Sequence, residues 1–123
     1  MSFSRIVLFL RWALFACLIG YGGILQAAEL GVVAFAQLPR EAKATIELIK
    51  QGGPFPYEKD GSVFGNYEKQ LPKRQRGYYR EYTVKTPHAR NRGAKRIVTG
   101  GRSPSYRYYY TEDHYRSFRE VIN

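Results

Sequence analysis

Hydrophobic positions between residues 38 and 51 recur at helical spacing. Ala42, Ile46 and Ile49 fall on one face, because residues three and four apart lie on the same side of an α-helix. Pro39 suits the first turn of a helix, and Gly52-Gly53 ends the pattern. The spacing therefore predicts one amphipathic helix over 38–51, whose apolar face must pack against another element.

Three later segments have the apolar and aromatic pattern of β-strands. They cover 78–85, 95–99 and 106–111. Gly100-Gly101 and Ser103-Pro104 predict a hairpin-like turn between the last two. An earlier apolar run, 31–35, suits either a strand or the lead-in to the helix. A helix followed by a run of strands predicts an α+β fold, with one N-terminal helix packed on an antiparallel β-sheet.

The first 28 residues have the pattern of an export signal. Arg5 and Arg11 supply a positive flank, and 12–25 contains neither a charged residue nor a proline. That stretch is shorter than the roughly 20 residues that a membrane-spanning helix needs. We predict a signal peptide over 1–28 and one domain over 29–123. The domain would be secreted, to the periplasm or outside the cell, without stable membrane association; an uncleaved N-terminal anchor is the alternative.

Charge restricts the class of partner. The chain has 20 Lys and Arg against 10 Asp and Glu, and residues 1–28 hold two of the basic ones and none of the acids. Residues 29–123 therefore carry a formal charge of 18 minus 10, or +8, which predicts attraction to nucleic acid or another anionic surface. Eleven basic residues lie from Lys69 to Arg102, with Glu81 as the single acid among them. A carboxylate weakens the binding of phosphate, whereas a site that removes a proton beside a phosphate needs one.

Strand geometry places Glu81 relative to its neighbours. Because alternate residues of a strand face the same side, Glu81 would point away from the helix while Tyr82 and Val84 pack toward it. Arg96 on a neighbouring strand could then join Glu81. An ordinary cross-strand ion pair is the alternative interpretation.

Two arginines and a histidine are the further catalytic candidates. Arg92 and Arg96 suit a phosphate, because a guanidinium donates two parallel hydrogen bonds. His114 lies in a turn after the last predicted strand, and a glutamate base with a histidine acid on opposite sides of a phosphate forms a matched pair. Asp113 would either keep His114 protonated or serve the turn alone, and His88 is interpreted as incidental. A lone histidine is more often a packing or surface residue.

The segment Asn66-Tyr67-Glu68 suggests a base-binding loop. A carboxylate accepts two hydrogen bonds from a base edge with adjacent N–H donors, and guanine has such an edge. Such a tripeptide more often marks only a turn.

Several segments, in their order and spacing, resemble the guanyl-specific microbial ribonucleases, the family that includes barnase, and above all its short secreted bacterial members. The matching segments are Gly53–Tyr57 with Asp60-Gly61, Val63-Phe64 with Asn66 and Glu68, Gly77–Val84, Thr86-Pro87 through Arg96-Ile97, and Tyr109–Tyr115. The resemblance implies a single helix packed on an antiparallel sheet. It implies Glu81 as general base, His114 as general acid, Arg92 and Arg96 on the scissile phosphate, and Tyr115 beside it.

The resemblance also implies how the base is bound. Glu68 would accept hydrogen bonds from guanine, backbone groups from Gly65 through Asn66 to Glu68 would bind its other polar edge, and Phe64 or Tyr67 would contact the ring. Gly65 and Tyr67 replace polar residues of the family, which leaves the strength of the base preference open.

The bacterial relatives carry a disulfide that ties the N-terminal strand to the C-terminus. Ala34 stands about where the first cysteine would be, and the single cysteine, Cys17, lies in the predicted signal. The domain would then depend on its core alone for stability.

The expected activity is cleavage of single-stranded RNA after guanosine. The first step would give a 2′,3′-cyclic phosphate and the second its hydrolysis, with no metal and no other cofactor. With reference pKa values of about 4.3 for Glu and 6.5 for His, the pH profile would be bell-shaped and mildly acidic. A monomer and a barstar-like acidic inhibitor are further expectations. The alternative is a non-catalytic cationic protein that binds RNA or an anionic surface.

Overall fold

Six strands, one α-helix and one short 3-10 helix build residues 30–123, which are the residues that the computed structural model describes. The strands are β1 (Gly31–Ala34), β2 (Ser62–Val63), β3 (Tyr79–Thr83), β4 (Arg96–Gly100), β5 (Arg107–Thr111) and β6 (Arg119–Ile122). The 3-10 helix η1 spans Phe35–Gln37 and the α-helix α2 spans Arg40–Gln51. The signal peptide predicted over 1–28 lies outside the described residues.

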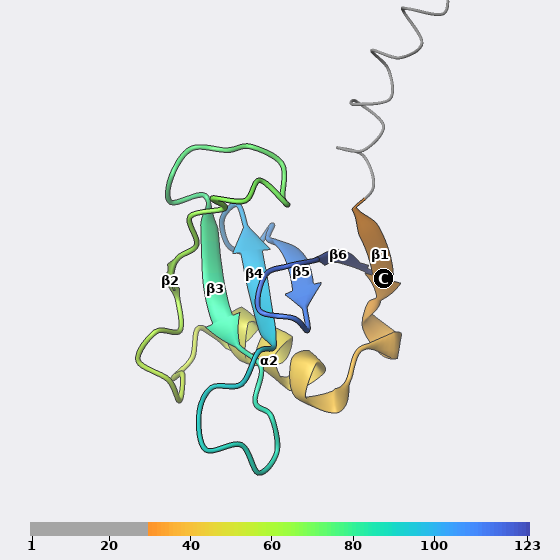
Figure 1. The fold of residues 1–123 in the computed structure, drawn as a ribbon, viewed down its shortest axis with the longest axis vertical. Helices are drawn as coiled ribbons and strands as arrows, with labels where there is room; N and C mark the ends of the chain where they lie inside the picture. The colour runs from red at the N-terminus through yellow and green to blue at the C-terminus, as the bar shows by residue number, and fades with distance from the viewer. Residues whose placement is uncertain (1–29) are drawn as a thin grey trace, which may run out of the picture.

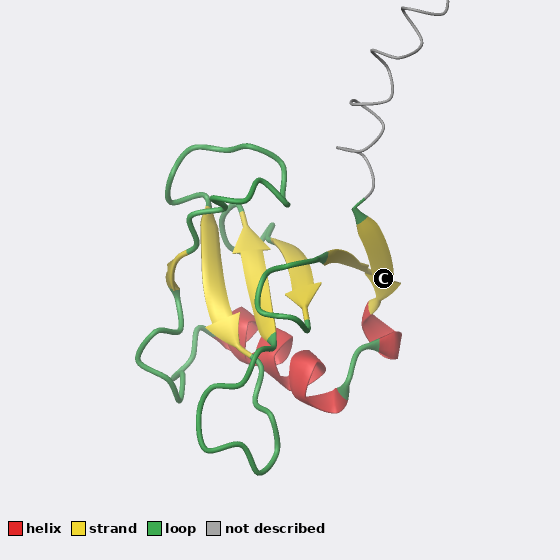
Figure 2. Cartoon of the chain, viewed as in Figure 1, coloured by secondary structure: helices red, strands yellow, loops and turns green. Residues whose placement is uncertain are grey.

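The strands form one sheet in the order β1-β6-β5-β4-β3-β2. Neighbours pair antiparallel except β1 and β6, which are parallel. Figures 1 and 2 show α2 lying across one face of this sheet. The predicted α+β fold is thus confirmed, although β2 and β6 were not predicted and the sheet is mixed. Two-residue β2 and the charged segment of β6 are too short to show an alternating pattern.

The helix α2 begins two residues later than predicted. Leu38 and Pro39 have extended backbones, with ψ of 151° at each, so helical geometry starts at Arg40. The helix ends at Gln51, as predicted, and is capped by Gly52, whose φ of 83° is a left-handed conformation that glycine adopts without steric cost. No helix within residues 30–123 has the length and hydropathy needed to cross a membrane.

Hydrophobic clusters cover both faces of the sheet. The cluster beneath α2 contains Ile46 of the helix and, among others, Tyr82, Val84, Ile97 and Tyr110 of the strands and their ends. This arrangement confirms the predicted orientation of Tyr82 and Val84. The cluster on the opposite face is built from Leu71, Tyr79, Val98, Tyr109 and Phe118. Because β4 is covered on both sides, all five of its residues are buried.

The pairing of β1 with β6 holds the two ends of the described chain together. In this parallel ladder Ala34 lies opposite Ile122. No cysteine occurs in residues 30–123, so backbone hydrogen bonds of this ladder, and no disulfide, join these two segments.

Replacing Ile46 by Ala should strongly destabilise the domain. Ile46 is 1% exposed at the centre of the helix–sheet cluster, and loss of a buried isoleucine typically costs about 2–5 kcal/mol because a cavity remains. Urea unfolding should show a drop of about 3 kcal/mol in the free energy of unfolding. Glu47→Ala, on the exposed side of the same turn, is the control; equal losses in both variants would contradict this packing.

Candidate active site

A buried carboxylate, Glu81 of β3, lies on the sheet face opposite α2. Its side chain is 7% exposed. Arg92 Nη2 donates to both carboxylate oxygens, at 3.0 Å and 2.8 Å. Arg96 Nε lies 3.4 Å from Oε2, and the Tyr115 hydroxyl donates to the same oxygen at 2.8 Å. Two guanidiniums and a phenol therefore compensate the removal of this carboxylate from water.

Two side chains that the sequence did not single out hold Arg92 in place. Arg92 Nε donates to Thr83 Oγ1 at 2.8 Å, and Arg92 Nη2 lies 4.0 Å from Asp60 Oδ1. Asp60, with a side chain only 2% exposed, accepts backbone hydrogen bonds from Thr83 at 2.8 Å and from Tyr57 at 3.1 Å. In the sequence, Asp60 was named only within the segments that resemble the family, and no role was predicted for it. Its distance of 23 residues from Thr83 gave no signal for this contact.

Arg96 is fixed by backbone carbonyls. Its side chain is 3% exposed, and Nη1 donates to the carbonyls of Gly93 at 3.0 Å and Lys95 at 2.8 Å. Its Nε also donates to the Tyr115 hydroxyl at 3.2 Å. The β3–β4 loop thus positions both arginines beside one carboxylate, as the predicted pairing of Arg96 with Glu81 required.

Ser62 is a further neighbour of Glu81 that the sequence analysis missed. Ser62 of β2 lies directly opposite Glu81 of β3 in the antiparallel ladder, and the Ser62 hydroxyl lies 3.2 Å from Glu81 Oε1. The same hydroxyl lies 2.6 Å from the Lys59 carbonyl, which therefore competes for its one hydrogen. The contact depends on the β2–β3 register, which a two-residue strand does not reveal in the sequence.

A tight turn after β5 presents His114 and Tyr115. Both residues have positive φ, 56° and 73°. The turn is held by Asp113, which accepts hydrogen bonds from the Thr111 hydroxyl and from Ser117. Burial alone would raise the pKa of Asp113, but these hydrogen bonds outweigh it and hold the pKa below its ordinary value. Asp113 therefore stabilises the turn, the second of its two predicted roles.

The turn is also attached to the arginine loop. The backbone N–H of His114 donates to the Ala94 carbonyl at 2.9 Å, while the His114 side chain is exposed. His88 lies elsewhere on the β3–β4 loop, exposed and with a φ of 66°. It lines none of the cavities described below, in agreement with its interpretation as incidental.

Tyr115 connects the charged cluster to an aromatic wall. Burial raises the pKa of its phenol to about 12, and the hydrogen bond to Glu81 and the negative charge of Glu81 add to this rise. The ring stacks on Phe64, with centroids 4.8 Å apart and planes at 28°. The hydroxyl end thus faces Glu81 and Arg96, and the ring faces the base-binding loop.

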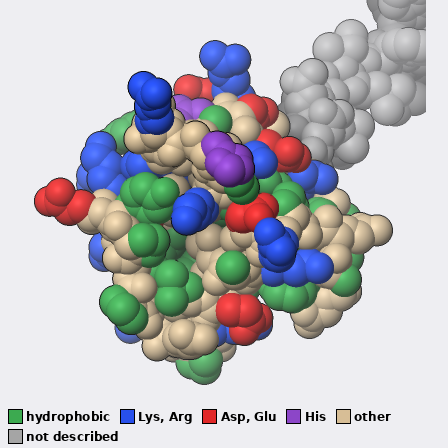
Figure 3. All heavy atoms as spheres, turned by 90° about the horizontal axis from the view of Figure 1, so that it is seen from below, with side chains coloured by type: hydrophobic (Ala, Val, Ile, Leu, Met, Phe, Trp, Pro, Cys, Tyr) green, Lys and Arg blue, Asp and Glu red, His purple; other side chains and the backbone are tan. Residues whose placement is uncertain are grey.

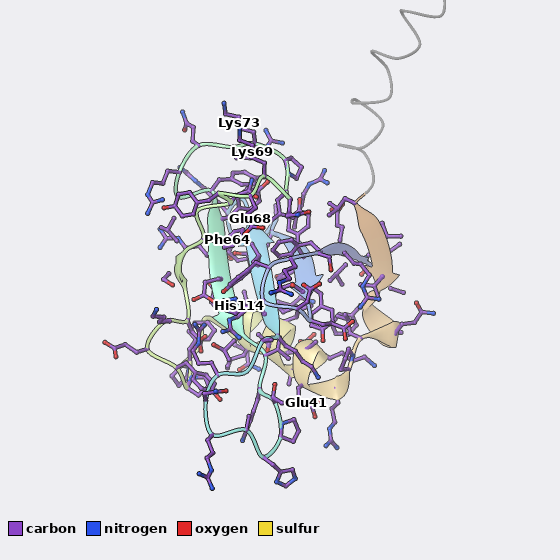
Figure 4. The ribbon with its side chains drawn as sticks, viewed as in Figure 1. Glu41, Phe64, Glu68, Lys69, Lys73 and His114 are labelled. Atoms are coloured by element: carbon purple, nitrogen blue, oxygen red, sulfur yellow. The ribbon has the colours of Figure 1, made fainter. Side chains whose placement is uncertain are left out.

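A cavity of about 210 Å³ lies beside this wall, and we call it the base pocket. Its lining residues are Phe64, Asn66, Tyr67, Glu68, Gln70, His114 and Tyr115. The structure therefore brings the predicted base-binding residues, except Gly65, together with the predicted acid His114. Figure 4 shows Phe64 between Glu68 and His114 in this view. Hydrogen bonds of the Tyr115 hydroxyl connect the pocket to the predicted base Glu81 and to Arg96, and Arg92 is bonded in turn to Glu81.

The loop from Phe64 to Glu68 has a defined internal structure. The Asn66 side chain donates to the Leu71 carbonyl at 2.9 Å and accepts from the Leu71 N–H at 3.1 Å. Its amide therefore supports the loop and leaves base contacts to backbone groups and Glu68, whose side chain is exposed. A Cβ at position 65 would overlap the Tyr67 ring. The two family departures, Gly65 and Tyr67, are thus sterically coupled.

Basic side chains dominate the surroundings of the site. Figure 3 views the molecule from the end that carries the β3–β4 loop, and blue Lys and Arg side chains are spread around purple His side chains there, with fewer red carboxylates between them. This distribution agrees with the expected attraction to a polyanion.

Comparison with known proteins gives consistent matches. Residues 26–122 match the family model described as ribonuclease. Guanyl-specific ribonuclease St of Saccharopolyspora erythraea is 56% identical over 90 residues, which are 73% of this chain and 86% of the relative. Guanyl-specific ribonuclease Sa of Kitasatospora aureofaciens is 52% identical over 88 residues, 72% of this chain and 90% of the relative.

Solved structures of ribonuclease Sa2 are also similar to the chain. A structure from a study of its complexes with mononucleotides aligns with a TM-score of 0.73 at 45% identity, covering 76% of this chain and 95% of that one. A structure of the same protein with guanosine-2′-cyclophosphate aligns with a TM-score of 0.70 at 44% identity, covering 76% and 96%.

Replacing Glu81 by Gln should lower the pKa of Tyr115. The carboxylate charge disfavours the phenolate, so its removal should bring the pKa down from about 12, while burial, the largest cause of the rise, still raises it above its ordinary value. Titration of ring-labelled tyrosine by NMR would measure this. Glu120→Gln is the control, since Glu120 raises the pKa of Tyr109. An unchanged pKa of Tyr115 in Glu81→Gln would contradict the contact between Tyr115 and Glu81.

Proposed function

The chain belongs to the guanyl-specific microbial ribonucleases, and from this membership we propose how its own residues cleave RNA. The activity is that of an endoribonuclease that cuts single-stranded RNA on the 3′ side of guanosine by way of a 2′,3′-cyclic phosphate. The observation that carries the assignment of roles is the buried carboxylate of Glu81, which shares one sheet face with two fixed arginines and the base pocket.

Glu81 acts as the general base. Its carboxylate removes the proton from the ribose 2′-hydroxyl, whose oxygen then attacks the adjacent phosphorus. In the structure Arg92 and Arg96 lie against Glu81. A phosphate entering between them would compete for the same guanidinium hydrogens. Substrate binding would therefore loosen the hold on the carboxylate at the moment when it has to accept a proton.

The arginines and His114 act on the phosphate and the leaving group. Arg92 and Arg96 stabilise the negative charge that builds on the phosphoryl oxygens, with their guanidiniums already oriented by Thr83 and by backbone carbonyls. His114, exposed at the rim of the base pocket, protonates the departing 5′-oxygen. In the second step the roles are exchanged, and water opens the cyclic phosphate. DNA lacks the 2′-hydroxyl and is not cut.

Guanine occupies the base pocket. Glu68 accepts hydrogen bonds from the N–H donors of the base, and the backbone of the loop that Asn66 braces binds the other polar edge. Phe64, Tyr67 and Tyr115 supply the aromatic surface. This arrangement leaves the carboxylate of Glu68 as the main side-chain determinant of base preference.

Secretion, the monomeric state and an acidic inhibitor belong to the same proposal. The family match begins at residue 26, which supports a boundary near the proposed end of the signal at residue 28. The formal charge of +8 after that boundary suits a barstar-like acidic partner by electrostatic complementarity. The localisation is tested by comparing export of the full chain with export of a chain that lacks residues 1–28. The full chain should be secreted, and the shortened chain should not.

Purified residues 29–123 should cleave GpC in the presence of EDTA. Because a pocket built to hydrogen-bond one base leaves its polar groups unpaired with another, ApC, UpC and CpC should react at least about a hundredfold more slowly. Chromatography of the products should show guanosine 2′,3′-cyclic phosphate before guanosine 3′-phosphate. Equal rates for all four dinucleotides would remove Glu68 from its proposed role.

Glu81→Gln should separate catalysis from binding. Loss of a positioned general base typically lowers the rate about 10²–10⁴-fold, whereas removing a buried negative charge beneath a basic surface should leave RNA affinity equal or higher. Rates on GpC and fluorescence anisotropy with labelled RNA measure the two effects, with Glu47→Gln as the control. A full rate in folded Glu81→Gln would assign the base to another group.

A further inference from the structure

A cluster of basic residues outside the catalytic machinery follows the base-binding loop. Lys69, Lys73, Arg74 and Arg76 fall within eight residues, and no acid occurs among them. All four are exposed. None of the four forms an ion pair with any residue in the described range 30–123. Their charge is therefore available to a ligand.

These four residues line a groove of about 330 Å³, which we call the basic groove. Phe64, Asn66 and Tyr67 line both the basic groove and the base pocket. The groove includes none of the catalytic candidates Glu81, Arg92, Arg96 and His114. The two cavities are thus adjacent, with the base-binding loop as their common wall.

The segment that carries these cations is anchored to the fold. Leu71 is 2% exposed and is bonded through both backbone groups to Asn66. Arg76 Nη1 donates to the Tyr67 hydroxyl at 3.1 Å, and the Arg74 guanidinium lies over the Tyr78 ring at 5.2 Å. Arg74 and Arg76 are therefore held in place beside the pocket, and less conformational entropy is lost when they bind an anion.

The direction of the groove identifies its ligand. In Figure 4 Lys69 and Lys73 lie beyond Glu68, on the side away from His114. An RNA strand whose scissile phosphate lies near His114 and whose guanine lies against Glu68 would reach this side with the nucleotides that precede guanosine. Tyr67, 82% exposed on the wall between the two cavities, offers a ring on which a base can stack.

We propose that the basic groove binds the RNA backbone on the 5′ side of the cleaved guanosine, with Tyr67 as a stacking surface for the preceding base. The inference rests on the proposed function, since it places the groove relative to the guanosine that the enzyme cleaves. Its consequence is a preference for polymeric RNA: the groove adds affinity for a strand with 5′ phosphates and none for a dinucleotide.

The test compares three substrates: GpC, GpC preceded by eight adenosine nucleotides, and GpC followed by eight. For each protein the quantity of interest is kcat/KM for an extended substrate divided by kcat/KM for GpC. If the groove neutralises two phosphates, the log–log salt slope of this ratio for the 5′-extended substrate is about −1.4, an about sevenfold fall between 50 and 200 mM salt. We expect the 5′ extension to raise kcat/KM mainly by lowering KM.

We call the ratio for the 5′-extended substrate the 5′ ratio. In the variant Lys73→Gln/Arg74→Gln this ratio should fall most of the way to one, and its salt dependence should largely disappear. Arg40→Gln/Lys50→Gln removes the same charge from exposed positions of α2, on the other face of the sheet, and should keep both. Tyr67→Ala should lower the ratio without changing its salt slope. Thermal unfolding of each variant checks that it is folded.

Distinct outcomes separate this proposal from the proposed function. Failure of the parent protein to cleave GpC would overturn the enzyme assignment itself. Cleavage of GpC with a 5′ ratio that Lys73→Gln/Arg74→Gln does not change would overturn the groove alone. A larger kcat/KM ratio for the 3′-extended substrate than for the 5′-extended one would overturn the proposed 5′ direction of the bound strand. If Lys73→Gln/Arg74→Gln no longer binds phosphatidylglycerol vesicles that the parent protein binds, but keeps the parent's kcat/KM ratio for the 5′-extended substrate, the groove is a surface for anionic membranes and the RNA assignment is overturned.

Discussion

The contact between Glu81 and its two arginines is the interaction on which the catalytic face depends. It joins β3 to β4, to the β3–β4 loop and, through Tyr115, to the turn after β5. A buried carboxylate without these partners would be strongly unfavourable, and so would two arginines packed together without it. Each partner is therefore required by the others, and loss of one leaves an uncompensated charge beneath the surface.

The proposed mechanism requires this cluster to change when substrate binds. Arg92 and Arg96 contact Glu81 in the structure, and under the proposed mechanism the phosphate of RNA would compete for them. Backbone carbonyls, Thr83 and Asp60 keep the guanidiniums oriented during this exchange. Positioning of this kind lowers the reorganisation needed in the transition state, which is the main source of electrostatic catalysis.

The two faces of the sheet carry different kinds of groups. One face packs on α2 through a hydrophobic cluster. The other face carries a second hydrophobic cluster together with the charged groups Glu81, Arg92 and Arg96. Phe64 and Tyr115 stack between the charged cluster and the base pocket, so the proposed phosphate chemistry and base recognition would share one aromatic wall. The basic groove continues that wall beyond Tyr67, and it would extend recognition from one nucleotide to a strand.

The sequence alone determined the helix, the three central strands and the isolation of Glu81 among cations, because periodicity and composition are local properties. It also placed Tyr82 and Val84 toward the helix, and the resemblance assigned the site residues. Only the tertiary structure decided which groups meet: Ser62 and Asp60 at the site, Asp113 with Ser117, and β1 beside β6. These contacts depend on strand register and on turns with positive φ, which arise when distant segments pack and leave no periodic pattern along the chain.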